Sequence, residues 1–157
     1  IRDSFLAVLA KTLADANVAS EQIWLEATER GFMNAAAARA TIERARAAGH
    51  VIAIDDFGTG YSSLSLLETL PLDTLKIDKS FIRAIGKQAA TSLVIPHIIE
   101  MGHSLNFKIV AEGVETEAQQ VYLRDAGVEF AQGWLYSKAL PADDFLAFHN
   151  LTNRPSA

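Results

Sequence analysis

Five short apolar runs alternate with helix-like segments along this chain, and that alternation limits the possible folds more than any other feature of the sequence. The apolar runs span residues 23–25, 51–54, 72–77, 107–110 and 130–135. The helix-like segments span residues 2–17, 34–48, 63–69, 88–104, 115–126 and 142–150, with Gly49 and Gly127 placed as helix stops and Asn34 or Thr116 as helix starts. Strands that alternate with helices predict a parallel sheet with right-handed crossovers, either open or closed into a barrel.

Every predicted strand ends in an ionisable or amide side chain, which favours the barrel. These residues are Glu26, Asp55 with Asp56, Lys76, Glu112 and Gln132. Polar groups from many strands meet at the carboxyl face of a barrel, whereas an open sheet concentrates its site at one switch point. A complete eight-stranded barrel needs about 250 residues, and this chain has 157. We therefore expect an α/β fold, a TIM-like (β/α)8 barrel whose N-terminal strands are missing from this chain, and a single partial domain over residues 1–157.

The composition excludes several classes of function. Half of the residues are apolar, which is typical of a globular domain. The formal net charge of −5 leaves no basic footprint, so we predict no binding to polymeric nucleic acid. No apolar run approaches the roughly 18 residues that cross a bilayer, so we predict no membrane insertion of this segment. The absence of cysteine suits a reducing compartment, and we expect a cytoplasmic location, either free or as the output domain of a membrane-anchored sensor.

The second apolar run ends in two adjacent carboxylates, Asp55 and Asp56, followed by a glycine-rich turn. Carboxylate oxygens are preferred ligands of Mg²⁺ and Mn²⁺, and without cations these two residues would repel Glu26 and Glu112 at the same edge of the sheet. Because side chains alternate along a strand, we expect the strand to end between the two aspartates so that both reach one site. Two ions about 3.5 to 4 Å apart would bind one phosphate, lower the pKa of a water between them and stabilise the leaving oxygen. Lys76 would position the water or offset negative charge.

Simpler explanations exist for each position taken alone. The two aspartates would also suit a solvated turn, and Lys76 would also suit an ion pair with Asp78 on the same strand face. Glu112 and Glu115 would also suit a helix N-terminus, where negative charge is favourable. Five such coincidences at five strand ends favour one shared site over separate explanations.

The motifs resemble those of the EAL-domain cyclic di-GMP phosphodiesterases, which are modified (β/α)8 barrels. The resemblance covers nearly all of the chain and rests on five motifs in order: Glu-Ala-Thr-Glu at 26–29, Asp-Asp-Phe-Gly-Thr-Gly-Tyr-Ser-Ser-Leu at 55–64, Leu-Lys-Ile-Asp at 75–78, Val-Ala-Glu-Gly-Val-Glu-Thr at 110–116 and Ala-Gln-Gly at 131–133. It implies hydrolysis of cyclic di-GMP to linear pGpG with Mg²⁺ or Mn²⁺ as the cofactor.

The resemblance also implies roles for individual residues. The implied metal ligands are Glu26, Asp55, Asp56 and Glu112. Lys76 resembles the lysine that helps to activate the water. Glu112 resembles the further acid that acts as ligand or base, and Gln132 corresponds to a polar residue that acts on water or substrate. Glu29 is similar to the glutamate that anchors the loop over residues 57–63, a loop linked to metal binding and to dimerisation. Glu115 and Asp78 are expected to lie beside these residues and support them.

Part of the family pattern is absent from this sequence. The Glu-Ala-Leu signature, with its ligand glutamate, and an asparagine ligand both belong before the first residue here. We therefore expect this chain alone to be inactive, and the parent protein to be a homodimer with an N-terminal sensory region. Three other functions remain as alternatives: a degenerate module that binds cyclic di-GMP or a protein without hydrolysis, an enolase-like lyase with a lysine base and carboxylate-held Mg²⁺, and a structural dimer module.

Overall fold

The computed structural model describes residues 3–28, 35–58, 64–87 and 89–152 of the chain. Five parallel strands form one sheet in the order β1-β2-β3-β4-β5. The strands are β1 (Trp24–Thr28), β2 (Val51–Phe57), β3 (Thr74–Ile77), β4 (Lys108–Glu112) and β5 (Phe130–Gln132). Each of the five predicted strands is confirmed, although half of their boundaries shift by two or three residues.

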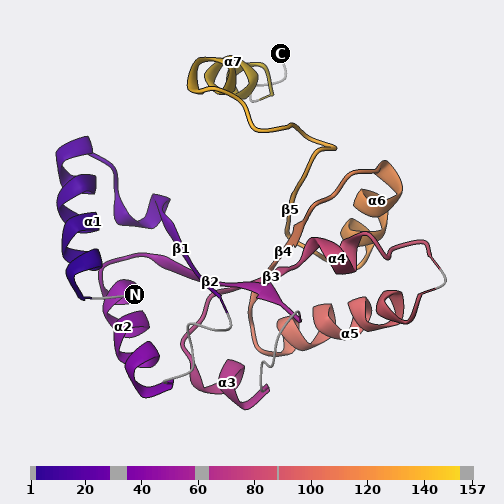
Figure 1. Ribbon diagram of the computed structural model, residues 1–157, viewed down its shortest axis with the longest axis horizontal. Coiled ribbons are helices and arrows are strands. Elements are labelled where there is room, and N and C mark those ends of the chain that lie inside the picture. Colours follow the sequence, from indigo (N-terminus) through magenta and orange to yellow (C-terminus); the bar gives the residue numbers. More distant parts are fainter. Residues whose placement is uncertain (1–2, 29–34, 59–63, 88, 153–157) are drawn as a thin grey trace.

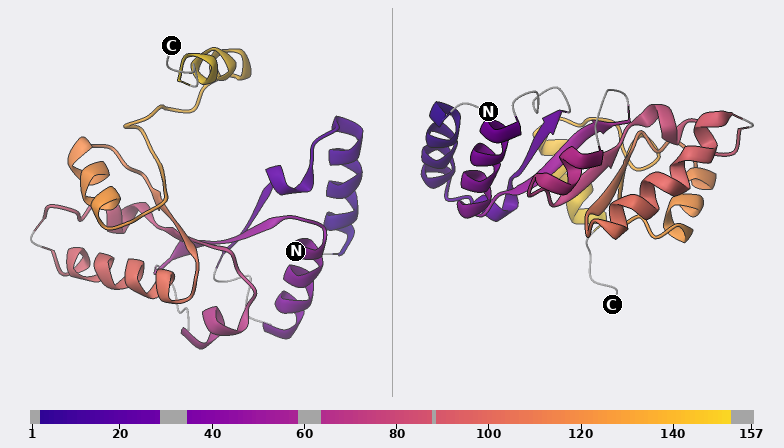
Figure 2. Two further views of the ribbon diagram at one scale, coloured as in Figure 1. Left: turned by 180° about the vertical axis from the view of Figure 1, so that it is seen from behind. Right: turned by 90° about the horizontal axis from the view of Figure 1, so that it is seen from below.

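Helices precede, connect and follow the strands, and those between the strands lie on one face of the sheet (Figure 1). They are α1 (Asp3–Ala16), a 3-10 turn η1 (Ser20–Gln22), α2 (Ala35–Ala47), α3 (Leu64–Thr69), α4 (Lys79–Ile82), α5 (Ala90–Ser104), α6 (Glu117–Asp125) and α7 (Ala142–Thr152). Six of them match predicted segments, whereas α4 was not predicted because four residues are too few to show a periodic pattern. Helix α7 lies apart from the other helices at the end of an extended segment (Figures 1 and 2).

The predicted helix signals are confirmed where the structure describes them. Gly49 and Gly127 follow α2 and α6 with φ of +98° and +84°, a conformation that glycine adopts without strain. Thr116 is the N-cap of α6, and its side chain accepts a hydrogen bond from the backbone N–H of Gln119. The other predicted helix start, Asn34, lies outside the described residues.

The core lies between the sheet and the helices on its outer face. Outward-facing strand residues are fully buried there, namely Ile52, Ile54, Leu75, Ile77, Ile109 and Ala111. They belong to one apolar cluster with helix residues Ile42, Ala45, Ile95, Ile99 and Leu123. Because side chains alternate along a strand, burying these residues outward turns the intervening positions, including Lys76, toward the inner face.

The sheet is curved, so that its first and last strands approach each other. Trp24 on β1 and Phe130 on β5 meet edge to face with ring centroids 5.6 Å apart, although β1 and β5 are not hydrogen-bonded neighbours. A five-stranded parallel sheet with helices outside and this curvature is consistent with part of a barrel. No helix among the described residues combines the length and apolar character needed to span a membrane.

Candidate active site

The ammonium group of Lys76 lies at the centre of a carboxylate cluster. Its Nζ is 2.7 Å from Glu26 Oε1, 2.9 Å from Asp55 Oδ1 and 2.7 Å from Glu112 Oε1. These three acids come from β1, β2 and β4, and Lys76 comes from β3 between them. Parallel strands place their carboxyl ends at one edge, and alternation turns these side chains to the inner face. The predicted meeting of strand-end residues at one point is therefore confirmed for these four.

The environment of Lys76 keeps it protonated. Its side chain is only 6 % exposed, and burial by itself lowers the pKa of a lysine. The hydrogen bonds to Glu112, Glu26 and Asp55 outweigh this effect and raise the pKa of Lys76 well above its ordinary value. The site therefore contains a permanent positive charge at neutral pH.

Glu112 is the most constrained acid of the cluster. Its Oε1 accepts hydrogen bonds from Lys76 Nζ and, at 2.8 Å, from Gln132 Nε2 on β5. Burial raises the pKa of Glu112, and repulsion from Asp55 and Glu26 adds to this effect, while Lys76 opposes it. The net effect is a raised pKa of Glu112.

A bulge in β2 brings Asp55 and Asp56 to the same site. Ile54 pairs with Leu75, and Phe57 pairs with Ile77. Between these two pairs β2 contains one more residue than β3. The bulge lies at Asp56, whose backbone is left-handed with a φ of +55°. Aspartate tolerates this conformation better than most residues do. The prediction that the strand ends between the two aspartates is therefore wrong, since β2 continues to Phe57 and the bulge cancels the alternation.

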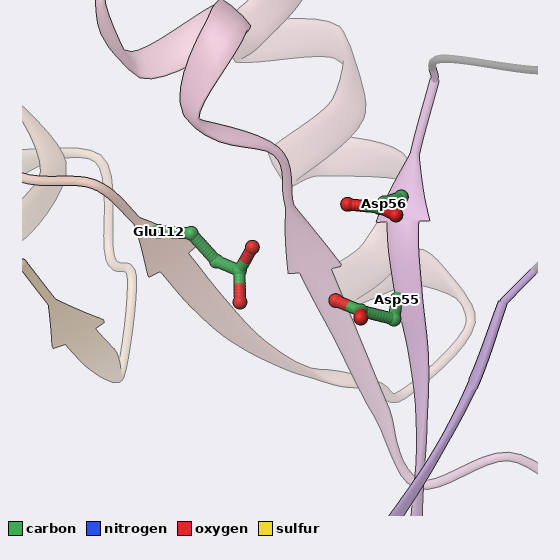
Figure 3. A group of neighbouring side chains, drawn as sticks. All are labelled: Asp55, Asp56 and Glu112. Carbon is green, nitrogen blue, oxygen red and sulfur yellow. The ribbon is translucent and has the colours of Figure 1, made fainter.

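Asp55, Asp56 and Glu112 form a group that fits a divalent cation. One carboxylate oxygen from each lies within 4.8 Å of the others, and Figure 3 shows the three side chains pointing toward one another. Glu26 reaches the same cluster through Lys76. Four carboxylates face one ammonium, so negative charge is in excess, and an all-oxygen donor set suits Mg²⁺ or Mn²⁺.

A comparison with known families identifies the fold family. The family model described as the EAL domain matches residues 2–139. This chain belongs to the EAL-domain family. The chain is 56 % identical over 125 residues to a protein of Escherichia coli K12 named probable cyclic di-GMP phosphodiesterase PdeB, covering 80 % of this chain and 23 % of that protein. It thus spans about a quarter of the length of this relative.

Solved structures agree with the family and with the barrel expected from the sequence. The EAL domain of Mycobacterium smegmatis DcpA superposes with a TM-score of 0.90 at 34 % identity, covering 99 % of this chain and 70 % of that one. Klebsiella pneumoniae BlrP1, solved as a manganese and cyclic di-GMP complex, gives a TM-score of 0.78 at 31 % identity and covers 87 % and 35 % of the two chains. The expected α/β class and EAL-type barrel are confirmed.

Other predicted residues of the EAL domain lie outside the cluster. Glu115 pairs with Arg83 at 3.1 Å on the surface. Asp78 caps α4 by accepting the backbone N–H of Ser80 at 2.9 Å, so the alternative in which it pairs with Lys76 is wrong. Burial would raise the pKa of Asp78, but the bonds from Ser80 hold it below its ordinary value. Glu29 and most of the loop expected at 57–63 lie outside the described residues.

Two residues that the sequence analysis gave no role support the rim of the EAL domain. Gly133 follows Gln132 so close to Val114 that a Cβ would overlap the backbone of Val114. Gln119 is buried and bonds to backbone groups of the loop before α6 and of helix α4. A signal for Gln119 was present, because Thr-x-x-Gln at 116–119 matches a capping box; no local pattern indicates which backbone Gly133 approaches.

Proposed function

We propose that this chain is the C-terminal part of a phosphodiesterase domain that hydrolyses cyclic di-GMP to linear pGpG with two Mg²⁺ or Mn²⁺ ions. The observation that carries the proposal is the grouping of Asp55, Asp56 and Glu112 oxygens within 4.8 Å beside the Lys76 ammonium. Support also comes from PdeB, whose name states this activity, and from BlrP1, whose structure contains manganese and cyclic di-GMP.

In this proposal each residue of the cluster has a role. Glu26, Asp55, Asp56 and Glu112 would hold the metal ions. When bound, two such ions lower the pKa of the attacking water and stabilise negative charge on the phosphate and leaving oxygen. Lys76 is the donor closest to the carboxylates and orients the water while offsetting developing charge. Gln132 fixes the rotamer of Glu112 through its 2.8 Å bond.

The reaction itself is a displacement at phosphorus. The water oxygen bonds to the phosphorus, the bond from phosphorus to the ribose O3′ breaks, and O3′ takes up a proton. The ring opens to a linear dinucleotide with one phosphomonoester. Glu112 would serve either as a metal ligand or as the base that accepts the proton from the water, and its carboxylate lies 2.7 Å from Lys76 Nζ.

The proposal extends to the parent protein. We propose that the parent is a cytoplasmic homodimer under an N-terminal sensory region, and that residues 1–157 alone are inactive because the Glu-Ala-Leu signature is not in this sequence. The alternative is a module that binds cyclic di-GMP without hydrolysis.

The test measures pGpG release from cyclic di-GMP with Mn²⁺ by the full-length protein, by its Asp56→Asn variant and by the 157-residue chain. The expected result is turnover by the full-length protein, a fall of at least about 100-fold in the variant, and no turnover by the isolated chain. Tight binding of cyclic di-GMP without any turnover by the full-length protein would favour the non-hydrolysing module instead.

A further inference from the structure

Lys76 and Glu112 lie near the end of the pairing between β3 and β4. Lys76 is paired with Val110 on β4, and Glu112 is paired with Gln132 on β5. The last residues paired between β3 and β4 are Ile77 and Ala111. Beyond them β3 leads into α4, while β4 leads through Glu112 into a loop over residues 113–116 that begins α6. The 2.7 Å contact between Lys76 and Glu112 therefore depends on strand pairing on one side and on the contacts between the two departing segments on the other.

Gln119 connects these two segments. Its side-chain Nε2 donates to the carbonyl oxygen of Ile82 in α4 at 3.1 Å. Its Oε1 accepts the backbone N–H groups of Glu115 at 2.8 Å and Thr116 at 3.0 Å. The residue is 8 % exposed and its bond to Ile82 is buried, so losing that bond leaves buried polar groups unpaired. The bonds to Glu115 and Thr116 are part-buried.

Two other contacts join these segments. Gly113 packs so closely on α4 that a Cβ would come 2.6 Å from Lys79 Cβ, a fit that requires the loop to stay in place. Arg83 and Glu115 form an ion pair at 3.1 Å, but their side chains are 54 % and 37 % exposed. Exposed ion pairs contribute about 0 to 1 kcal/mol. Of the links seen here, the Gln119 amide is the buried, directional one.

We propose that Gln119 is a positioning residue that holds the loop after Glu112 against the helix after Lys76, and so sets the geometry of these two groups. The consequence for catalysis rests on the proposed function. The geometric part does not, because it follows from three hydrogen bonds of one buried amide. The competing explanation is that Gln119 only caps α6 as the third residue of its capping box.

Two substitutions separate positioning from capping. Gln119→Glu keeps an oxygen that accepts from the N–H groups of Glu115 and Thr116, and glutamate is a normal residue at this place of a capping box. It removes the donor to Ile82, which cuts the bridge. Thr116→Ala removes the N-cap side chain and leaves all three side-chain bonds of Gln119 in place.

The first measurement is steady-state hydrolysis of cyclic di-GMP by the full-length protein. Gln119→Glu is expected to lower kcat at least about tenfold with KM within about twofold, because small displacements of reacting groups cost that much or more. Thr116→Ala is expected to lower the unfolding midpoint and leave kcat within about twofold. The opposite pattern, with kcat reduced only in Thr116→Ala, or no loss of kcat in Gln119→Glu, overturns the proposal. If Gln119→Glu does not fold, Gln119→Ala is compared with Thr116→Ala on the same readout.

The second measurement needs no activity. A double-mutant cycle combines Gln119→Glu with Glu112→Gln in the full-length protein and follows the unfolding equilibrium constant of its EAL domain in urea. The expected coupling is at least about fivefold, since groups that share a network are not additive. A control cycle with Glu26→Gln, which pairs with Lys76 from β1, is expected to be additive within about twofold. Additivity in the first cycle overturns the positioning role, whereas intact coupling in a protein that hydrolyses nothing overturns only the proposed function.

Discussion

Replacing Lys76 by methionine should destabilise the chain through the acids that surround this lysine. The substitution keeps the length and apolar stem of the side chain and removes the ammonium. Asp55 and Glu112, whose side chains are 22 % and 16 % exposed, then face each other without a cation. Glu26 is 47 % exposed and is solvated by water instead.

The magnitude follows from this burial. Removing one partner of a buried ion pair costs about 3 to 5 kcal/mol, and an exposed pair adds at most about 1 kcal/mol. Since methionine fills the vacated space and Asp55 and Glu112 keep some contact with water, we expect a loss of about 3 kcal/mol in the free energy of unfolding. For a domain of this size that loss lowers the Tm by about 6 to 12 °C.

The assay is urea unfolding followed by circular dichroism, in EDTA and low salt, between pH 6 and 9. The pKa of Lys76 is raised in the folded state. Its contribution to the free energy of unfolding is therefore fully present below the ordinary lysine pKa, and it is lost only as the pH rises through the higher pKa of the folded state. The decrease in unfolding free energy caused by Lys76→Met should therefore be constant between pH 6 and 9. Lys87→Met, at an exposed lysine after α4, is the matched control and should change stability by less than about 0.5 kcal/mol. A loss of under about 1 kcal/mol for Lys76→Met would refute the reasoning.

Two further substitutions test the support of the rim. Gly133→Ala should lower the unfolding free energy by about 1 to 3 kcal/mol, because the added Cβ overlaps the backbone of Val114. The control Gly86→Ala, where φ is also positive but the Cβ enters open space, should lower it by less. Equal losses for the two variants in urea unfolding would contradict this. Asp78→Ala should cost about 1 kcal/mol by removing the cap on the Ser80 N–H. Because the pKa of Asp78 is lowered in the fold, this difference from the wild type should be complete above its ordinary pKa and shrink as the pH falls below it. A difference unchanged between pH 6 and pH 3.5 would rule out the charged cap.

The sequence carried enough information to predict the strands and their meeting point. An apolar run such as 51–54 is short, bounded by polar residues and separated from the next run by a segment with helical periodicity, so its type is set by local pattern. Alternation then determines which side chains face inward. For this reason Glu26, Lys76 and Glu112, which are far apart in sequence, were placed together before any distance was known.

The details of the rim were not predictable in the same way. A bulge at Asp56 depends on the register between β2 and β3, which arises from packing of both strands on the helices and leaves no local pattern. The four residues of α4 are too few for a periodic signal, so the sequence did not indicate that Asp78 caps a helix; it was expected to support the site, with pairing to Lys76 as the alternative. The role of Gln119 depends on a carbonyl 37 positions earlier, at Ile82, and only the folded chain brings them together.

The left-handed backbone of Asp56 affects how any substitution there should be interpreted. Asp56→Ala would remove the carboxylate and also add about 1 to 2 kcal/mol of backbone strain. An inactive Asp56→Ala enzyme would therefore not show whether activity was lost with the carboxylate or through distortion of β2. Asparagine accepts the same backbone and has the same shape without the charge. A natural relative with asparagine here would keep its architecture and lose one anionic oxygen, whereas one with a β-branched residue would have to rebuild the strand as well.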